Sequence, residues 1–178
     1  MTKALQPEEA ILQPEEQNFV SSRLHIVLFE PEIAQNTGNI ARTCACIGAD
    51  LHLVEPMGFR LSDKNMKRAG LDYWDKLNIV RYTCTKDFLE KHEEDTKYFF
   101  TGQTTNIFYD YDVSNTEEDV YLIFGRESRG IDPEILEAYA DVCVRIPMRE
   151  TLRSLNLANT VALASYEAMR QRNFIGLI

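Results

Sequence analysis

The chain has 178 residues and a formal net charge of −9; 44% of its residues are hydrophobic and 26% are charged. This length is enough for one domain with a sizeable core, and the acidic balance argues against a protein that coats nucleic acid non-specifically. No apolar run reaches the roughly 18 residues that a membrane helix needs, and the first residues have neither the basic nor the apolar part of a signal peptide.

The first 22 residues contain the sequence QPEE twice, at 6–9 and 13–16. Prolines and glutamates in so short a stretch favour a flexible acidic tail over a packed element. We therefore expect a tail at 1–22 and one folded domain over 23–178, without an interior linker or repeat.

Cysteine and histidine spacing does not predict a metal site. The four cysteines include no CxxC pair, and the chain has only three histidines: His25, His52 and His92. Zinc is therefore not expected, and scattered thiols in a chain without an export signal indicate a reducing cytoplasm.

Short apolar runs alternate with segments of helical spacing. The apolar runs predict strands at 24–31, 50–56, 78–83, 97–102, 120–125 and 142–147. Helical spacing predicts helices at 36–48, 62–70, 86–94 and 132–140, followed by a closing helix over 153–171. This alternation indicates an α/β domain whose mostly parallel sheet is covered by helices on both faces.

Local chemistry defines several of the expected helix ends. Gly48 suits the C-cap of the first helix. Asp132 and Pro133 suit the N-cap and first position of the helix at 132–140.

The common nucleotide and acyl-transfer fingerprints are missing. No GxGxxG follows the first strand, and the chain contains no GxSxG elbow. The stretch GRESRG at 125–130 has the GxxxxG spacing of a phosphate loop but lacks the Lys-Ser/Thr that must follow it. A Rossmann dinucleotide site, NTP hydrolysis and serine acyl transfer are therefore not supported.

Four polar stretches follow predicted strands, at 30–42, 124–130, 145–148 and 153–157. Taken singly, each has a structural reading: Asn36 or Asn39 as a helix cap, Gly38 as a bend, Glu127 as a solvated turn residue. Parallel sheets bind ligands at the carboxyl ends of their strands. Four such stretches at strand ends are therefore better explained by one site.

The closing helix begins with more polar side chains than capping requires. Arg153, Ser154, Asn156 and Asn159 crowd its start, although a single side chain is enough to cap a helix. We expect one of Ser154 and Asn156 to cap the helix and the surplus to face a ligand.

These motifs together resemble a known family. NTGNIAR, FGRESRG, RIPM and RSLNLANT…YE resemble the signature regions of the SPOUT methyltransferases, and the similarity extends over about 24–176. Within that family, the spacing of LFEPEIAQNTGNIARTC, EPMGF and KRAGLDYW is similar to the TrmL-type enzymes. This resemblance implies methylation of the ribose 2′-hydroxyl of the wobble nucleotide, a cytidine or modified uridine, in the anticodon stem-loop of tRNA.

The resemblance also implies a fold and a cofactor. It implies a C-terminal trefoil knot, a homodimer, and S-adenosylmethionine bound by the knot loops without a metal. Two alternatives remain open at this point: the same chemistry on ribosomal RNA, and a catalytically silent RNA- or nucleotide-binding module of the same fold.

The family motifs assign roles to particular residues. Those matching catalytic positions are Asn36, Arg42, Glu127, Ser154 and Asn156. Those expected to bind the cofactor are Thr101, Gly102, Gly125, Ile146, Met148, Ser154 and Leu155. An arginine is a poor general base because its pKa lies above about 12. We therefore expect Arg42, shared from the partner subunit, to grip phosphate and stabilise the ribose oxyanion.

The closing helix is apolar nearly all round, including at Leu157, Val161 and Leu163. Such a helix is buried on two sides. We expect a second subunit to supply one of the covers, with Tyr166 near the interface.

Overall fold

The computed structural model describes residues 21–60, 77–151 and 154–178. The predicted helix at 62–70 and residues 1–20 of the predicted tail lie outside the described residues. Ser22, which we assigned to the tail, is buried, and its hydroxyl donates to the carbonyl of Gly48 at 3.0 Å. The folded domain therefore includes it.

Six parallel strands form one sheet with the order β3-β2-β1-β5-β4-β6. Their bounds are Leu24–Phe29 (β1), Asp50–Val54 (β2), Ile79–Tyr82 (β3), Thr96–Phe100 (β4), Val120–Phe124 (β5) and Cys143–Val144 (β6). All six lie where apolar runs predicted strands. The last is shorter than expected, because the chain leaves the sheet after Val144 to form a loop.

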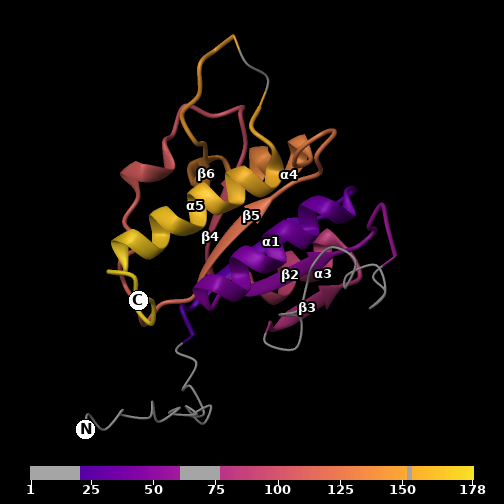
Figure 1. Cartoon of the computed structure of the whole chain (residues 1–178). Coiled ribbons are helices and arrows are strands. Elements are labelled where there is room, and N and C mark those ends of the chain that lie inside the picture. The colour runs from indigo at the N-terminus through magenta and orange to yellow at the C-terminus, as the bar shows by residue number, and fades with distance from the viewer. Residues whose placement is uncertain (1–20, 61–76, 152–153) are drawn as a thin grey trace, which may run out of the picture.

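Helices cover both faces of this sheet (Figure 1). They are α1 (Ala34–Ile47), α3 (Thr85–Lys91), α4 (Pro133–Ala138) and α5 (Leu157–Gln171), with short 3-10 turns η2 (Phe108–Asp110) and η3 (Ala140–Val142). α1 begins two residues before the prediction and α5 four residues after it. Gly48 adopts the left-handed C-cap conformation after α1, and Pro133 opens α4, as expected.

Two hydrophobic clusters fill the space between the layers. The larger one joins α1 and α5 to one face of the sheet, through residues such as Ile40, Val161 and Leu122. The smaller one joins α3 and α4 to the other face, through Phe88 and Leu136. Burial on both faces explains why the strands read as continuous apolar runs rather than alternating ones.

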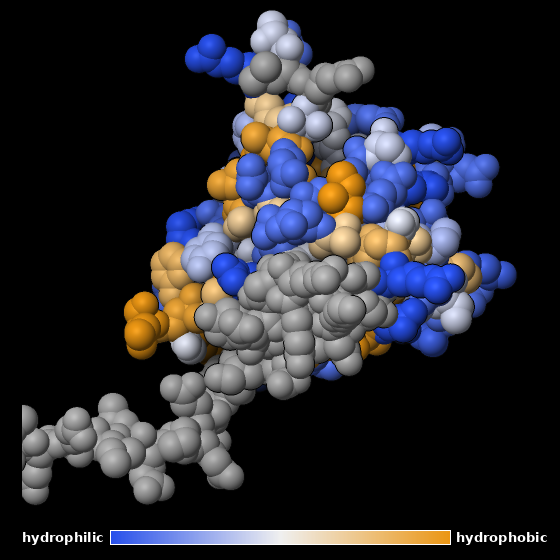
Figure 2. Space-filling model, turned by 45° about the vertical axis from the view of Figure 1, so that its right-hand side comes forward, coloured by the Kyte–Doolittle hydropathy of each residue, from blue (hydrophilic) through white to orange (hydrophobic). Residues whose placement is uncertain are grey.

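Some large hydrophobic side chains remain exposed in the single chain. They are Ile33, Tyr109, Leu155, Leu163, Tyr166, Phe174 and Ile178. On the face seen in Figure 2, hydrophobic surface lies in patches among hydrophilic side chains. In the described part of the chain, no helix has the length and apolar character that crossing a membrane requires.

Candidate functional site

A pocket of about 520 Å³ opens at the carboxyl ends of the strands. Its walls come from the segments that follow β1, β4, β5 and β6, together with the start of α5. This volume lies in the range of small-molecule sites, roughly 300–1,000 Å³. Ten of the predicted site residues line it: Asn36, Thr101, Gly102, Gly125, Glu127, Ile146, Met148, Ser154, Leu155 and Asn156.

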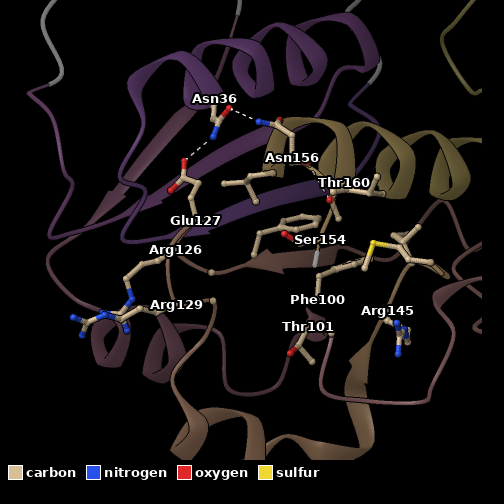
Figure 3. Close-up of a pocket in the computed structure, with 18 of the residues that line it drawn as sticks. Asn36, Phe100, Thr101, Arg126, Glu127, Arg129, Arg145, Ser154, Asn156 and Thr160 are labelled. Atoms are coloured by element: carbon tan, nitrogen blue, oxygen red, sulfur yellow. Dashed lines mark hydrogen bonds between the residues drawn. The ribbon is translucent and has the colours of Figure 1, made fainter. Parts of the chain in front are cut away.

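A chain of polar side chains crosses the rim of this pocket (Figure 3). The amide Nδ2 of Asn156 donates to Oδ1 of Asn36 at 3.0 Å, and Nδ2 of Asn36 donates to Oε1 of Glu127 at 3.0 Å. These contacts join residues 120 and 91 positions apart in the sequence. The Glu127 carboxylate can only accept a hydrogen bond, so it fixes the orientation of the Asn36 amide. The oxygen of Asn36 in turn fixes the orientation of the Asn156 amide.

Glu127 also binds the backbone immediately before α1. Its carboxylate accepts the backbone N–H of Glu32 at 2.9 Å and that of Ile33 at 3.3 Å. Ile33 is the N-cap residue of α1, and its side chain has no polar group that could accept a hydrogen bond. A negative charge is favourable at the positive end of the helix dipole. Glu127 is therefore not a solvated turn residue, and neither Asn36 nor Asn39 caps α1.

Asn156 is the N-cap of α5. Its Oδ1 accepts the backbone N–H groups of Ala158 at 2.9 Å and Asn159 at 3.4 Å. The same side chain thus caps one helix with its oxygen and reaches the N-terminal turn of α1 with its nitrogen. Of the other polar residues named at this helix start, Ser154 and Asn159 are exposed and Ser154 lines the pocket, whereas Arg153 lies outside the described residues.

The loop after β5 is fastened to the connection between β1 and α1. The backbone N–H and the hydroxyl of Ser128 donate to the Glu32 carboxylate at 2.9 and 2.8 Å, and these bonds lower the pKa of Glu32. Arg126 donates to Glu30 at 2.9 Å and also pairs with Asp132. Two loops far apart in sequence therefore form one wall of the pocket.

Gly125 is required by the fold of its own loop. A Cβ at this position would lie 2.2 Å from the carbonyl carbon of Gly130 and 2.4 Å from the nitrogen of Ile131. The family motifs assigned Gly125 to the cofactor-binding residues, where a missing side chain would leave space for a ligand. The structure instead shows that the loop's own backbone fills the space. A Cβ on Gly102 would meet nothing within 4 Å.

Several lining residues were not singled out from the sequence. Phe100 and Phe124 end β4 and β5, and their rings stack with centroids 4.5 Å apart. Arg126 and Arg129 lie on one side of the pocket and Arg145 on the opposite side (Figure 3). The aromatic pair was detectable as the last apolar residue of each strand, directly before a predicted ligand loop.

Arg42 is the one predicted site residue that does not line this pocket. It lies on the exposed surface of α1, six residues after Asn36. Six residues of helix span about 9 Å. Within one chain, Arg42 and the pocket are therefore separate features.

Comparisons with known proteins identify the family of this chain. The SpoU rRNA Methylase family model matches residues 23–166. The chain is 47% identical over 154 residues to the "Putative tRNA (cytidine(34)-2'-O)-methyltransferase" of Geobacillus stearothermophilus, covering 86% of this chain and 98% of that one.

Solved structures are similar as well. One described as "Structural insights into the 2-OH methylation of C/U34 on tRNA" has a TM-score of 0.77 and 42% identity, covering 84% of this chain and 96% of that one. An AdoMet-bound rRNA methyltransferase from Sinorhizobium meliloti has a TM-score of 0.73 and 25% identity, covering 83% of this chain and 56% of that one. Fold, site and sequence thus place the chain in the SpoU rRNA methylase family.

Proposed function

We propose that this protein transfers a methyl group from S-adenosylmethionine to the ribose 2′-hydroxyl of nucleotide 34, the wobble position of tRNA. Family membership supports methyl transfer to RNA. The relative from Geobacillus stearothermophilus, which this chain matches over nearly its whole length, supports the tRNA position and the ribose as target. The observation that carries the proposal is the convergence of Asn36, Glu127 and Asn156 on the rim of the pocket.

The residues present fit the cofactor. The pocket has the size of a small-molecule site, a stacked aromatic pair in its wall and a carboxylate at its rim. When bound, S-adenosylmethionine supplies an electrophilic methyl group on a positively charged sulfur. Glu127 places negative charge at the rim, and the backbone around Thr101, Gly102, Ile146 and Met148 is suited to hold the adenosine. The AdoMet-bound relative supports this assignment.

The proposal also includes the trefoil knot, a reaction without a metal, and a cytoplasmic location. The loops at 125–130 and 145–151, with α5, would form the trefoil knot. Methyl transfer would proceed without a metal, because the alignment of donor and hydroxyl supplies much of the rate enhancement. The reaction would take place in the cytoplasm, which the four free cysteines support.

The exposed face of α5 supports a homodimer. Leu163 and Tyr166 are 45% and 46% exposed although they lie on a helix whose other face is fully buried. A second copy of this chain would cover them. Val161 does not belong to this surface, because it is 0% exposed in the core of its own chain.

Two glutamate substitutions distinguish an effect on dimer formation from an effect on folding. Leu163→Glu is expected to leave the chain folded and to convert the dimer to a monomer in sedimentation analysis. Val161→Glu is expected to unfold the chain, because it buries an unpaired charge at a cost of several kcal/mol. A native protein of monomeric mass, or an unchanged dimer in Leu163→Glu, would contradict this interface.

Arg42 is proposed to act on the pocket of the partner subunit. Its guanidinium can hold an RNA phosphate with two parallel hydrogen bonds and can stabilise the developing negative charge on the ribose oxygen. We do not assign it the role of the base, because a guanidinium is a poor general base. The proton would leave to a phosphate oxygen or to water.

Complementation between two inactive variants tests this proposal. Arg42→Ala is expected to lose methyl transfer while keeping its affinity for S-adenosylmethionine, and Asn156→Ala to be inactive in its own pocket. After subunit exchange, the mixture should regain partial activity, because some heterodimers hold one intact composite site. Arg42→Lys should rescue only in part, because it keeps the charge and loses the planar fork. A mixture that exchanges subunits and stays inactive would place Arg42 in its own chain's site.

The substrate needs a separate measurement. Mass spectrometry of tRNA incubated with the protein and S-adenosylmethionine should find one added methyl group on the ribose of nucleotide 34. Methylation of ribosomal RNA in place of tRNA would favour the alternative substrate.

A further inference from the structure

The three histidines of the chain, far apart in sequence, meet on the sheet face that α3 covers. His25 Nδ1 lies 2.9 Å from His52 Nε2, and His52 Nδ1 lies 2.9 Å from the Tyr82 hydroxyl. That hydroxyl lies 2.8 Å from His92 Nε2. These groups form one continuous hydrogen-bonded row, away from the pocket at the carboxyl ends of the strands.

A carboxylate ends the row on each side. Asp119 Oδ1 lies 3.2 Å from His25 Nε2, and Asp95 Oδ2 lies 2.7 Å from His92 Nδ1. The row therefore contains five contacts and needs five protons. Ionised carboxylates donate none, while three neutral imidazoles and one phenol donate four. One contact lacks its proton unless an imidazole is charged or a cation takes the proton's place.

The contact between His25 and His52 is where a cation fits. Sheet pairing sets His25 directly opposite Asp50, whose Oδ2 lies 3.7 Å from His25 Nδ1. The ligand atoms of His25, Asp50 and His52 all lie within 4.8 Å of one another. A cation here would leave four contacts for four protons, with every imidazole neutral.

Hydrogen bonds behind these three side chains orient them as ligands. With Nδ1 of His25 facing the site, its other nitrogen donates to Asp119. With Nε2 of His52 facing the site, its other nitrogen donates to Tyr82. Metal-binding histidines almost always donate their second N–H in this way, and metal-binding carboxylates are themselves hydrogen-bonded.

The Asp50 carboxylate is also held by a hydrogen bond, and the site is accessible from solvent. Asp50 Oδ2 accepts from the side-chain amide of Asn78 at 2.9 Å. The side chain of Asp50 is 28% exposed and that of His25 13%, so an ion and a water molecule can reach the site from solvent. Zn–N bonds of about 2.0–2.1 Å in tetrahedral geometry need the two nitrogens about 3.3 Å apart, so the rings must separate by about 0.4 Å.

We propose that His25, His52 and Asp50 bind a divalent transition-metal ion, with Zn²⁺ as the best match and water as the fourth ligand. Two imidazoles and one carboxylate are a ligand set that Zn²⁺ accepts, and three protein ligands leave one position open. We did not expect zinc from the sequence, because residue spacing does not reveal that β1 and β2 are neighbours in the sheet. This site is independent of methyl transfer.

Metal titration of the full chain tests the site. Protein without a polyhistidine tag, treated with EDTA and then freed of it, is titrated with Zn²⁺ by calorimetry and with Co²⁺ by visible absorption. We expect one ion per chain and a Co²⁺ spectrum of four-coordinate type. His25→Asn should abolish binding, and Asp50→Asn should weaken it about tenfold or more. His92→Asn is the matched control, because it removes an imidazole that is not a ligand, and should bind within about tenfold of the unaltered protein.

Two outcomes would overturn the proposal. One is the absence of stoichiometric binding at about 0.1 mM free Zn²⁺. The other is equal binding by His25→Asn and His92→Asn. In either case the contact between His25 and His52 is held by a proton on a charged imidazole. If His25→Asn fails to fold, the partly exposed Asp50→Asn and the Co²⁺ spectrum of the unaltered protein decide the question. S-adenosylmethionine binding should be the same with and without EDTA, which separates this test from that of the proposed function.

Discussion

Asn156 combines two roles that different substitutions separate. Its oxygen caps α5 and its nitrogen donates to Asn36. Asn156→Ala removes both. Loss of an N-cap costs about 1 kcal/mol, and loss of a hydrogen bond costs about 0.5–1.5 kcal/mol. The free energy of unfolding should therefore fall by about 1.5–2.5 kcal/mol, and Tm by about 3–10 °C for a chain of this size.

Asn156→Asp keeps the cap and removes only the donor. Aspartate caps helices as well as asparagine does, and its charge suits the helix N-terminus. Asn36 then lies between two carboxylates, because Glu127 already accepts its amide. Whichever way the Asn36 amide points, its oxygen faces one of these acceptors. We expect Asn156→Asp to be more stable than Asn156→Ala and yet to lose methyl transfer.

Three measurements check this pair. Thermal or urea unfolding gives the order of stability, calorimetry gives the affinity for S-adenosylmethionine, and a methyl-transfer assay gives the rate. If Asn156→Asp transferred methyl groups as fast as the unaltered protein, the amide donor would have no part in the site. If Asn156→Ala were as stable as Asn156→Asp, the capping contact would contribute nothing.

Two further predictions concern stability and are checked by thermal unfolding. Gly125→Ala should lower the free energy of unfolding by about 1–3 kcal/mol, because its Cβ would collide with the backbone of Gly130 and Ile131. Gly102→Ala is the control and should change it by less than about 0.5 kcal/mol. Equal stability of the two variants would contradict the close backbone contact at Gly125. Arg172→Ala should cost about 2–4 kcal/mol, since its buried guanidinium donates to three backbone carbonyls that would lose their partner. Arg81→Ala, which breaks an exposed ion pair with Glu55, should cost about 1 kcal/mol or less, and an equal cost for both would contradict this assignment.

The sequence by itself determined the elements of the fold and most of the site. Apolar runs, the C-cap at Gly48 and the N-terminal Asp132-Pro133 pair are local signals, because they depend on residues within one or two turns. The rule that ligands bind at strand ends then selected the loops that line the pocket. The resemblance of those loops to a known family supplied the individual residues, of which all but Arg42 line one pocket.

Only the tertiary structure decided which of these residues act on one another. Glu127 accepts the backbone N–H of Glu32, 95 residues away, just before α1, and Gly125 lies against the backbone of Gly130 and Ile131 in its own loop. The three histidines look unrelated in the sequence. His25 and His52 become neighbours when β2 aligns beside β1, and His92, at the end of α3, joins them through Tyr82 of β3. The physical reason is that hydrogen bonds and ligand contacts depend on distances of a few ångströms in space. The order of the strands in the sheet sets those distances, and the hydrophobic periodicity of a strand does not specify which other strands lie beside it.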